Sequence, residues 1–172
     1  MTAQPKTSIL FVCLGNICRS PLAEGVFGHV LEEHGTRGGF LLDSAGTGGW
    51  HIGSPPDRRS IAVAARNGLD ISGLRARKIM ADDFHRFDII LGMDRANVAD
   101  LQRIAPAPTR AKIHLYLDFA QGRASDVPDP YYGDAKDFEN VYRMIRNASE
   151  SLAGRLPDRA PAPESGQASS TM

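Results

Sequence analysis

Residues 8–21 read Ser8-Ile-Leu-Phe-Val-Cys13-Leu-Gly-Asn-Ile-Cys18-Arg19-Ser20-Pro21, an apolar run that passes through a short loop directly into a helix start. The run Ser8–Cys13 is aliphatic and partly β-branched, which predicts a buried strand. We place Ser20 as the N-cap of the following helix and Pro21 at its first helical position. Gly35 marks its end, so the helix is predicted over Pro21–His34.

The same alternation of short apolar runs and longer segments of helical period continues along the chain. It predicts a three-layer α/β fold, in which a parallel sheet is flanked by helices on both faces. Ligands bind at the carboxyl ends of the strands in such folds, so the loops after the strands are the places to look for chemistry. The further strands are expected at Phe40–Ala45, Asp88–Met93 and Lys112–Leu117, and the further helices at about Asp57–Asn67, Ala96–Ile104 and Ala135–Leu156.

The last of these helices has the clearest helical period. Its apolar residues recur at steps of three and four, which places them on one face and favours a role in the core. They are Phe138, Val141, Tyr142, Ile145, Ala148 and Leu152.

The composition fits one globular domain. Of the 172 residues, 42% are hydrophobic and 23% are charged, which suits a single core and leaves no room for a second full domain. The twenty Lys and Arg residues balance the twenty Asp and Glu residues, so net charge draws the chain neither to nucleic acid nor to an anionic membrane. We place the domain at residues 7–156. Residues 157–172 are rich in Pro, Ala and Ser and are expected to form a disordered tail.

The sequence also indicates a compartment. The N-terminal segment lacks the features of a signal peptide, and no run reaches the ~20 apolar residues of a membrane span. We therefore expect a cytoplasmic protein with reduced thiols. Its two cysteines, Cys13 and Cys18, are too few for a disulfide scaffold or for a four-ligand zinc site.

The loop from Leu14 to Ser20 is suited to bind an anion, because it joins a strand to a helix N-terminus. The free N–H groups of the first helical turn and the helix dipole attract a phosphate, and Gly15 lets the backbone close around it. The fork of Arg19 grips two phosphate oxygens at once. This positive environment favours the thiolate form of Cys13, to which Ser20 donates a hydrogen bond, while Asn16 tolerates left-handed backbone.

Other interpretations of these residues are less well supported. A single cysteine at a strand end is ordinarily a small buried hydrophobe, but the surrounding loop favours a nucleophile. A nucleotide-binding phosphate loop needs Gly-Lys followed by Ser or Thr, and Arg19 stands where no such lysine exists. The five histidines form no ligand-spaced pair near Cys13 or Cys18. We therefore expect no metal and no cofactor.

Four further motifs carry a resemblance to a known family. They are Asp43-Ser44-Ala45-Gly46-Thr47, Trp50, Leu91-Gly92-Met93-Asp94 and Asp129-Pro130-Tyr131-Tyr132-Gly133. With the loop after Cys13, they make about residues 7–156 resemble the low-molecular-weight protein tyrosine phosphatases. The resemblance implies a four-stranded parallel sheet in the order 2-1-3-4.

The resemblance also implies a reaction. Phosphotyrosine, or a small aryl phosphate, would be hydrolysed through a cysteinyl-phosphate intermediate, with Cys13 as nucleophile and Asp129 as general acid. Arg19 and the amides of the loop Leu14–Ser20 would bind the phosphate. A phenol leaves slowly as its anion, so a positioned acid is chemically needed. Asp126 competes locally for that role, but only Asp129 lies in the Asp-Pro-Tyr pattern.

The resemblance implies roles for further residues. Asn16, Ser20 and Ser44, with Asp94 as a further candidate, would support the loop. Many eukaryotic members carry a histidine in the segment that matches Ser72-Gly73-Leu74, and this chain has none. The substrate pocket would be walled by Leu14, Ile17, Trp50, Tyr131 and Tyr132. Without the resemblance, Trp and Tyr residues of this kind are as often core.

Cys18 resembles the second loop cysteine of many members, which protects the nucleophile through a reversible disulfide. A buried, inert thiol is the alternative. Two other functions remain open: an arsenate reductase that borrows an external thiol, and a non-catalytic module that binds phosphorylated ligands. The expected partner is a phosphotyrosine-containing protein, which includes a cognate tyrosine kinase among the candidates.

Overall fold

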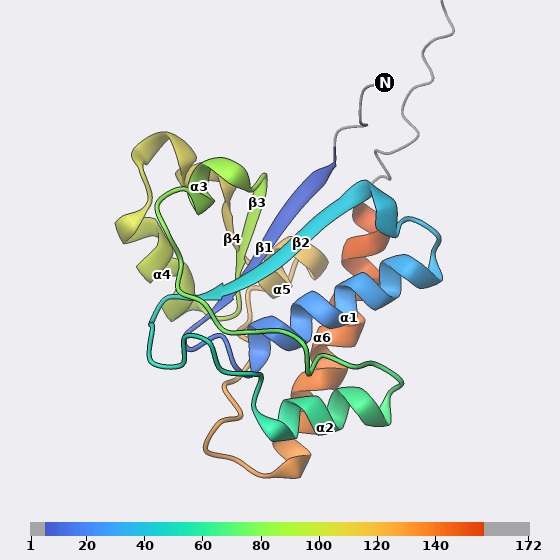
Figure 1. Ribbon diagram of the computed structural model, residues 1–172. Helices are drawn as coiled ribbons and strands as arrows, with labels where there is room; N and C mark the ends of the chain where they lie inside the picture. The colour runs from blue at the N-terminus through green and yellow to red at the C-terminus, as the bar shows by residue number, and fades with distance from the viewer. Residues whose placement is uncertain (1–5, 157–172) are drawn as a thin grey trace, which may run out of the picture.

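The computed structural model describes residues 6–156, which form a four-stranded parallel sheet between two layers of helices (Figure 1). The sheet order is β2-β1-β3-β4, so the expected order 2-1-3-4 is confirmed. The expected tail, 157–172, lies outside the described residues. The strands are β1 (Thr7–Cys13), β2 (Phe40–Gly46), β3 (Ile89–Gly92) and β4 (Ile113–Leu115).

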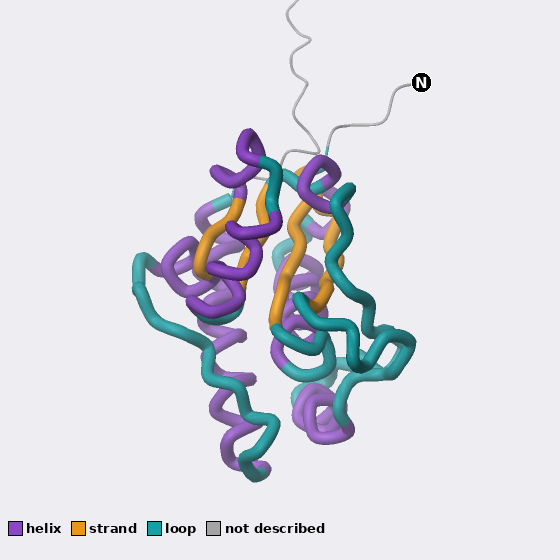
Figure 2. The backbone as a smooth tube through the Cα atoms, turned by 90° about the vertical axis from the view of Figure 1, so that its left-hand side faces the viewer, coloured by secondary structure: helices purple, strands orange, loops and turns teal. Residues whose placement is uncertain are grey.

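The helices divide between the two faces of the sheet (Figure 2). One face is covered by α1, α5 and α6, with α2 packed on α1 and α6 in the same layer, and the other face packs against α3 and α4. This arrangement confirms the expected three-layer fold. The helices are α1 (Arg19–Glu33), α2 (Arg58–Arg66), α3 (Asp83–Arg86), α4 (Arg95–Ile104), α5 (Tyr116–Gln121) and α6 (Ala135–Arg155), with short 3₁₀ turns at Arg37–Gly39 and Ala107–Lys112.

The side chains of β1 alternate between the two faces of the sheet and belong to the apolar cores on both faces. Ile9, Phe11 and Cys13 lie on the α1 and α6 side, whereas Leu10 and Val12 lie on the opposite side. All seven residues of β1 are buried, as expected of a central parallel strand. The register pairs Cys13 with Gly46 of β2. The loop after Cys13 therefore begins beside the carboxyl end of the neighbouring strand.

The apolar face of α6 is largely as its period predicts. Phe138, Val141, Ile145, Ala148 and Leu152 are buried, and Tyr142 is half-buried against them. A capping box fixes the start of the helix, because the side chains of Asp134 and Asp137 each accept from the backbone N–H of the other residue.

The prediction of Ser20 as N-cap and Pro21 as first helical residue is wrong. α1 begins at Arg19, with Cys18 as its N-cap, and the Cys18 side chain makes no capping hydrogen bond. The Ser20 hydroxyl contacts Cys13 Sγ instead. The first-turn N–H groups of α1 are therefore not capped by the Cys18 side chain, which suits anion binding.

The prediction of a strand over Lys112–Leu117 is also wrong at its end. β4 stops at Leu115, and Tyr116 begins α5, where its hydroxyl lies 3.0 Å from Ser149 Oγ of α6 and its ring packs edge-on against Phe11. An apolar run of this length does not distinguish a strand from the first turn of a buried helix. The short helix α3 was likewise not predicted.

Candidate active site

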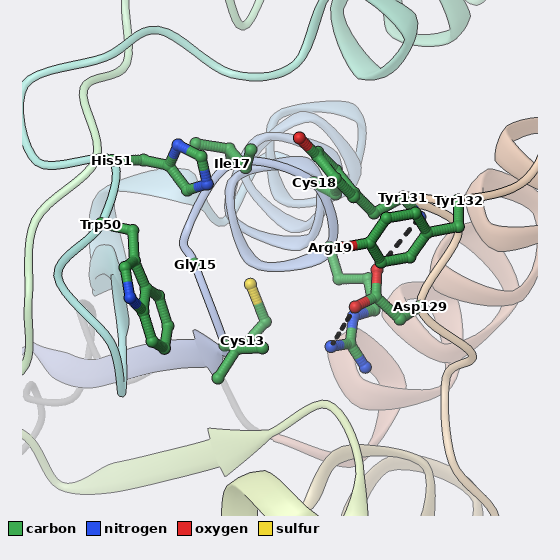
Figure 3. A pocket seen from close by; sticks show the side chains of 11 residues that line it. Cys13, Gly15, Ile17, Cys18, Arg19, Trp50, His51, Asp129, Tyr131 and Tyr132 are labelled. Atoms are coloured by element: carbon green, nitrogen blue, oxygen red, sulfur yellow. Dashed lines mark hydrogen bonds and ion pairs between the residues drawn. The ribbon is translucent and has the colours of Figure 1, made fainter.

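A cavity of about 320 Å³ opens where β1 meets the N-terminus of α1. Figure 3 shows Cys13 at its centre, with Trp50 and His51 on one side and Asp129 with the two tyrosines on the other. The cavity brings together three parts of the sequence: the loop after β1, the loop after β2 and the segment before α6. Its lining residues are Cys13, Leu14, Gly15, Ile17, Cys18, Arg19, Trp50, His51, Asp129, Tyr131 and Tyr132.

Cys13 lies at the floor of this cavity with a hydrogen-bonding partner. Only 3% of the residue is exposed, and its Sγ lies 3.1 Å from Ser20 Oγ. Asn16 adopts the left-handed backbone expected of it, with φ of 58°. Its side-chain Nδ2 reaches both Ser20 Oγ, at 2.7 Å, and Ser44 Oγ, at 3.0 Å.

These contacts fix the orientation of the Asn16 amide. The Oδ1 of Asn16 accepts from the backbone N–H of Arg77 at 2.9 Å, so its amide nitrogen must face the two serines. Each of its two protons then goes to one serine oxygen. The hydroxyl proton of Ser20 then has two acceptors, the carbonyl of Ala45 at 3.5 Å and Cys13 Sγ at 3.1 Å. When Cys13 is a thiolate, the proton goes to the sulfur and stabilises its charge.

The hydroxyl of Ser44 donates in turn to a residue that the sequence analysis did not single out. Its acceptor is Glu24 Oε1 of α1, at 2.7 Å. The segment Ser72–Leu74 does not supply this acceptor for Ser44, because the Ser72 side chain bonds locally to Asp70. Burial raises the pKa of Glu24 to about 7, and Asp43 adds to the rise, while the bond from Ser44 and the charges of Arg37 and Arg77 oppose it.

The raised pKa of Glu24 predicts a pH-dependent stability. Between its ordinary value of 4.5 and about 7, the folded state keeps the proton while the unfolded chain releases it, so stability falls as pH rises through this window. A shift of this size corresponds to about 3 kcal/mol.

The variant Glu24→Gln tests this prediction, because its side chain is neutral at every pH. Wild type should therefore lose about 3 kcal/mol of unfolding free energy relative to Glu24→Gln between pH 4.5 and pH 8. Urea unfolding of both proteins at several pH values measures this difference. Parallel pH profiles would exclude a buried, titrating Glu24.

Arg19 is held by two partners with its side chain almost fully buried. Nη1 donates to Asp94 Oδ2 at 2.7 Å and to the carbonyl of Val127 at 2.9 Å. Although burial opposes the charge, the facing groups Cys13, Asp94 and Asp129 raise the pKa of Arg19 above its ordinary value. Asp94, at the start of α4, therefore fixes the fork of Arg19 beside the loop. This is the support expected of a guanidinium that binds phosphate.

Asp129 faces the cavity from the loop before α6. Its Oδ2 lies 3.6 Å from Arg19 Nη2, and its Oδ1 accepts from the backbone N–H of Tyr131 at 3.1 Å. The carboxyl group is 44% exposed, so a substrate and water can both reach it. Asp126, the local competitor, instead pairs with Arg95 through the backbone N–H and Nε, and it does not line the cavity.

Aromatic and apolar side chains form the walls. Trp50 is 72% exposed and Tyr132 95% exposed, whereas Tyr131 meets the Tyr132 ring edge-on at 4.9 Å between centroids. Leu14 lines the mouth, while Ile17 lies deeper and is almost buried. His51 is a lining residue that the sequence did not reveal. No pattern marked it, since it reaches the cavity only because the loop after β2 folds back over Gly15.

Cys18 also lines the cavity and is 5% exposed. Burial, followed by the charges of Asp57 and Cys13, raises the pKa of its thiol to about 12. Within residues 6–156, no group of three or more His, Cys, Asp and Glu side chains is arranged to hold a metal ion. In the same range, none of the helices combines the length and apolar character that crossing a membrane requires.

Comparison with known proteins assigns the chain to a family. The chain matches the family described as "Low molecular weight phosphotyrosine protein phosphatase" over residues 8–161. The chain belongs to this family. The phosphatase is 43% identical over 146 residues to the low molecular weight phosphotyrosine protein phosphatase of Schizosaccharomyces pombe, an alignment that covers 84% of this chain and 93% of the relative.

Two further relatives agree with this assignment. The phosphatase is 41% identical to the low molecular weight protein-tyrosine-phosphatase YfkJ of Bacillus subtilis, over 87% of this chain and 95% of YfkJ. The crystal structure of a protein tyrosine phosphatase from Entamoeba histolytica superposes with a TM-score of 0.82 at 37% identity, covering 88% of this chain and all of that one. The protein is thus a protein-tyrosine phosphatase, a hydrolase whose family works through a cysteinyl-phosphate intermediate.

Proposed function

We propose that Cys13, Arg19 and Asp129 carry the hydrolysis of phosphotyrosine by this phosphatase. The observation that carries the proposal is their convergence in one cavity, with Cys13 Sγ beside the helix N-terminus and the Asp129 carboxyl 3.6 Å from the Arg19 fork. The loop amides of Leu14–Ser20 and the Arg19 guanidinium bind the phosphate. Asn16, Ser20 and Ser44 hold this loop and the Cys13 sulfur in place.

The first step transfers the phosphoryl group to the enzyme. The Cys13 thiolate attacks phosphorus, a P–S bond forms and the P–O bond to the tyrosine ring breaks. Asp129 gives its proton to the departing phenolic oxygen, so tyrosine leaves as a neutral phenol and Asp129 becomes a carboxylate. Arg19 and the loop N–H groups stabilise the charge on the transferring group.

The second step releases the phosphate. A water molecule attacks phosphorus of the cysteinyl phosphate, and the Asp129 carboxylate accepts its proton. The P–S bond breaks, inorganic phosphate leaves and the Cys13 thiolate returns. Ser20, which lies 3.1 Å from the sulfur, stabilises that thiolate as the leaving group.

The walls favour an aromatic phosphate on a protein. Trp50, Tyr131 and Tyr132 offer flat faces to a phosphotyrosine ring, with Leu14 and Ile17 as apolar edges. We also propose that the partner is a phosphotyrosine-containing protein, and a cognate tyrosine kinase is one candidate substrate. We propose no nucleic-acid partner. A free thiol nucleophile needs a reducing compartment, so we place the enzyme in the cytoplasm, with residues 7–156 as one catalytic domain.

The direct test is hydrolysis of a phosphotyrosyl peptide and of p-nitrophenyl phosphate by the purified protein, with a phosphoseryl peptide as control. Release of phosphate from the first two and little from the third is expected, because the shorter serine does not bring its phosphate to the cavity floor. Arsenate with glutathione and glutaredoxin, the external thiols, tests the reductase alternative. Absence of turnover with both aryl substrates would leave a module that only binds phosphorylated ligands.

Cys18 supports a redox prediction. Peroxide converts the Cys13 thiolate to a sulfenic acid; the Cys18 thiolate then attacks this sulfur, forming a disulfide and expelling hydroxide. Peroxide-inactivated enzyme should therefore regain most of its activity with dithiothreitol. Cys18→Ser should regain little after the same exposure, since its sulfenic acid oxidises further.

The high pKa of Cys18 sharpens this prediction. Because burial raises it to about 12, the thiolate fraction of Cys18 is small at neutral pH and grows with pH. The share of activity recovered by wild type should rise between pH 7 and pH 9 at equal peroxide damage. Equal recovery by wild type and Cys18→Ser would show that Cys18 is an inert buried thiol.

A further inference from the structure

The first turn of α2 lies between the two loops of the active site. The backbone N–H of Asp57, the N-cap of α2, donates to the carbonyl of Ile17 at 2.7 Å. The hydroxyl of Ser60 donates to the carbonyl of Cys18 at 3.3 Å. Both acceptors belong to the phosphate-binding loop, so this turn is anchored to the half of the site that holds the nucleophile.

Arg59 extends from the same turn to the other half of the site. Its Nη2 donates to the carbonyl of Tyr131 at 2.9 Å, and its Nη1 donates to the carbonyl of Gly133 at 3.2 Å. Asp57 orients the fork by accepting from Nε at 3.0 Å and from Nη2 at 2.9 Å. The guanidinium also stacks over the Phe138 ring, 4.4 Å from its centroid.

The contact with Tyr131 links Arg59 to the proposed acid. The same residue whose carbonyl accepts from Arg59 donates its N–H to Asp129 Oδ1 at 3.1 Å. Arg59 thus holds the backbone that orients the carboxyl group. The bond within this loop, from Gly133 N–H to the carbonyl of Pro130, is local and does not tie the loop to the rest of the fold.

We propose that Arg59 is a positioning residue, which holds the loop 129–133 so that Asp129 can protonate the leaving group. The inference rests on the proposed role of Asp129. A lysine at this position would keep the charge but lose the planar fork that reaches two carbonyls and one carboxylate together, and it would lose the stack on Phe138.

A purely structural role is less consistent with the geometry. The Arg59 side chain is 39% exposed, and ion pairs at such sites contribute little to stability. Its removal should therefore change the melting temperature little. Proton transfer is far more sensitive, because a small displacement of a catalytic group costs much of its rate contribution.

The test compares two substrates that differ in their need for an acid. Phenyl phosphate releases a phenol that must be protonated, whereas 2,4-dinitrophenyl phosphate releases a stable anion. For Arg59→Ala we expect kcat/KM to fall roughly 10- to 100-fold with phenyl phosphate. With the dinitrophenyl ester it should stay within about twofold. The matched control is Arg58→Ala, the exposed neighbour on the same turn, which should match wild type on both substrates.

Two further variants complete the experiment. Arg59→Lys should lose kcat/KM in the same leaving-group-dependent manner but to a smaller extent, which provides a second reading if the alanine variant folds poorly. In an Asp129→Asn background, Arg59→Ala should cost almost nothing further with phenyl phosphate, since the group it positions is gone.

The outcomes separate this inference from the role of Asp129. An equal loss on both substrates would assign Arg59 to the phosphate loop or to the pocket wall and overturn the inference. If Arg59→Ala loses no activity on phenyl phosphate while Asp129→Asn does, the inference about Arg59 is overturned and the acid role of Asp129 stands. If Asp129→Asn itself shows no dependence on the leaving group, the proposed acid role fails and the inference falls with it.

Discussion

Cys13→Ser is expected to lower kcat/KM for p-nitrophenyl phosphate by roughly 10⁴-fold or more. A serine hydroxyl ionises far less readily than a thiol, so the loop that stabilises a thiolate does not provide an alkoxide at neutral pH. Ser20 and Asn16 do not replace the nucleophile either, because their hydrogen-bonding groups serve the Cys13 sulfur and the neighbouring serines. Steady-state release of p-nitrophenol measures the loss.

Binding should survive this substitution. Arg19 and the loop amides are untouched, so Cys13→Ser should still bind a phosphotyrosyl peptide with an affinity near that implied by the wild-type KM. Isothermal titration calorimetry with the phosphorylated and the unphosphorylated peptide measures this. Strong binding without turnover separates loss of the nucleophile from loss of the fold. A variant with undiminished turnover would contradict the mechanism proposed above.

The local structure of the loop Leu14–Ser20 was predictable because its signal is local. Strand, Gly15, Asn16, Arg19 and helix follow each other within a few positions, and the backbone that connects them imposes their arrangement. The error at Ser20 has the same origin. Sequence pattern identifies a residue suited to cap a helix, but the structure uses that hydroxyl for the Cys13 sulfur.

The contacts of Glu24 and Arg59 were not predictable because they join residues that are distant in sequence. Glu24 looks like an ordinary polar residue of a helix until α1 packs against β2 and brings it to Ser44, twenty positions away. Arg59 meets the carbonyl of Tyr131 across 72 positions. Side chains that bond to backbone carbonyls leave no residue pattern, because every residue has a carbonyl.

Asp129→Asn is expected to lower kcat/KM for phenyl phosphate by roughly 10²- to 10⁴-fold. Asparagine keeps the shape of the side chain, and its carbonyl oxygen can still accept from the Tyr131 N–H, but it has no proton to give to phenolate. Asp129 has space to be replaced without strain, since its side chain is 44% exposed. A loss of this size therefore reflects proton transfer and not a disturbed fold.

The two kinetic constants should respond differently to Asp129→Asn. The ratio kcat/KM reports the steps up to cleavage of the P–O bond, so with 2,4-dinitrophenyl phosphate it should stay close to wild type. The value of kcat should fall for both substrates, because the cysteinyl phosphate is then hydrolysed without a base to take the proton from water. Pre-steady-state kinetics with the ester in excess over enzyme should show a burst of dinitrophenol followed by a slow steady state. Asp126→Asn is the matched control, since Asp126 pairs with Arg95 outside the cavity, and it should show neither effect. A fall in kcat/KM of equal size for both esters would instead assign Asp129 to phosphate binding, through its ion pair with Arg19.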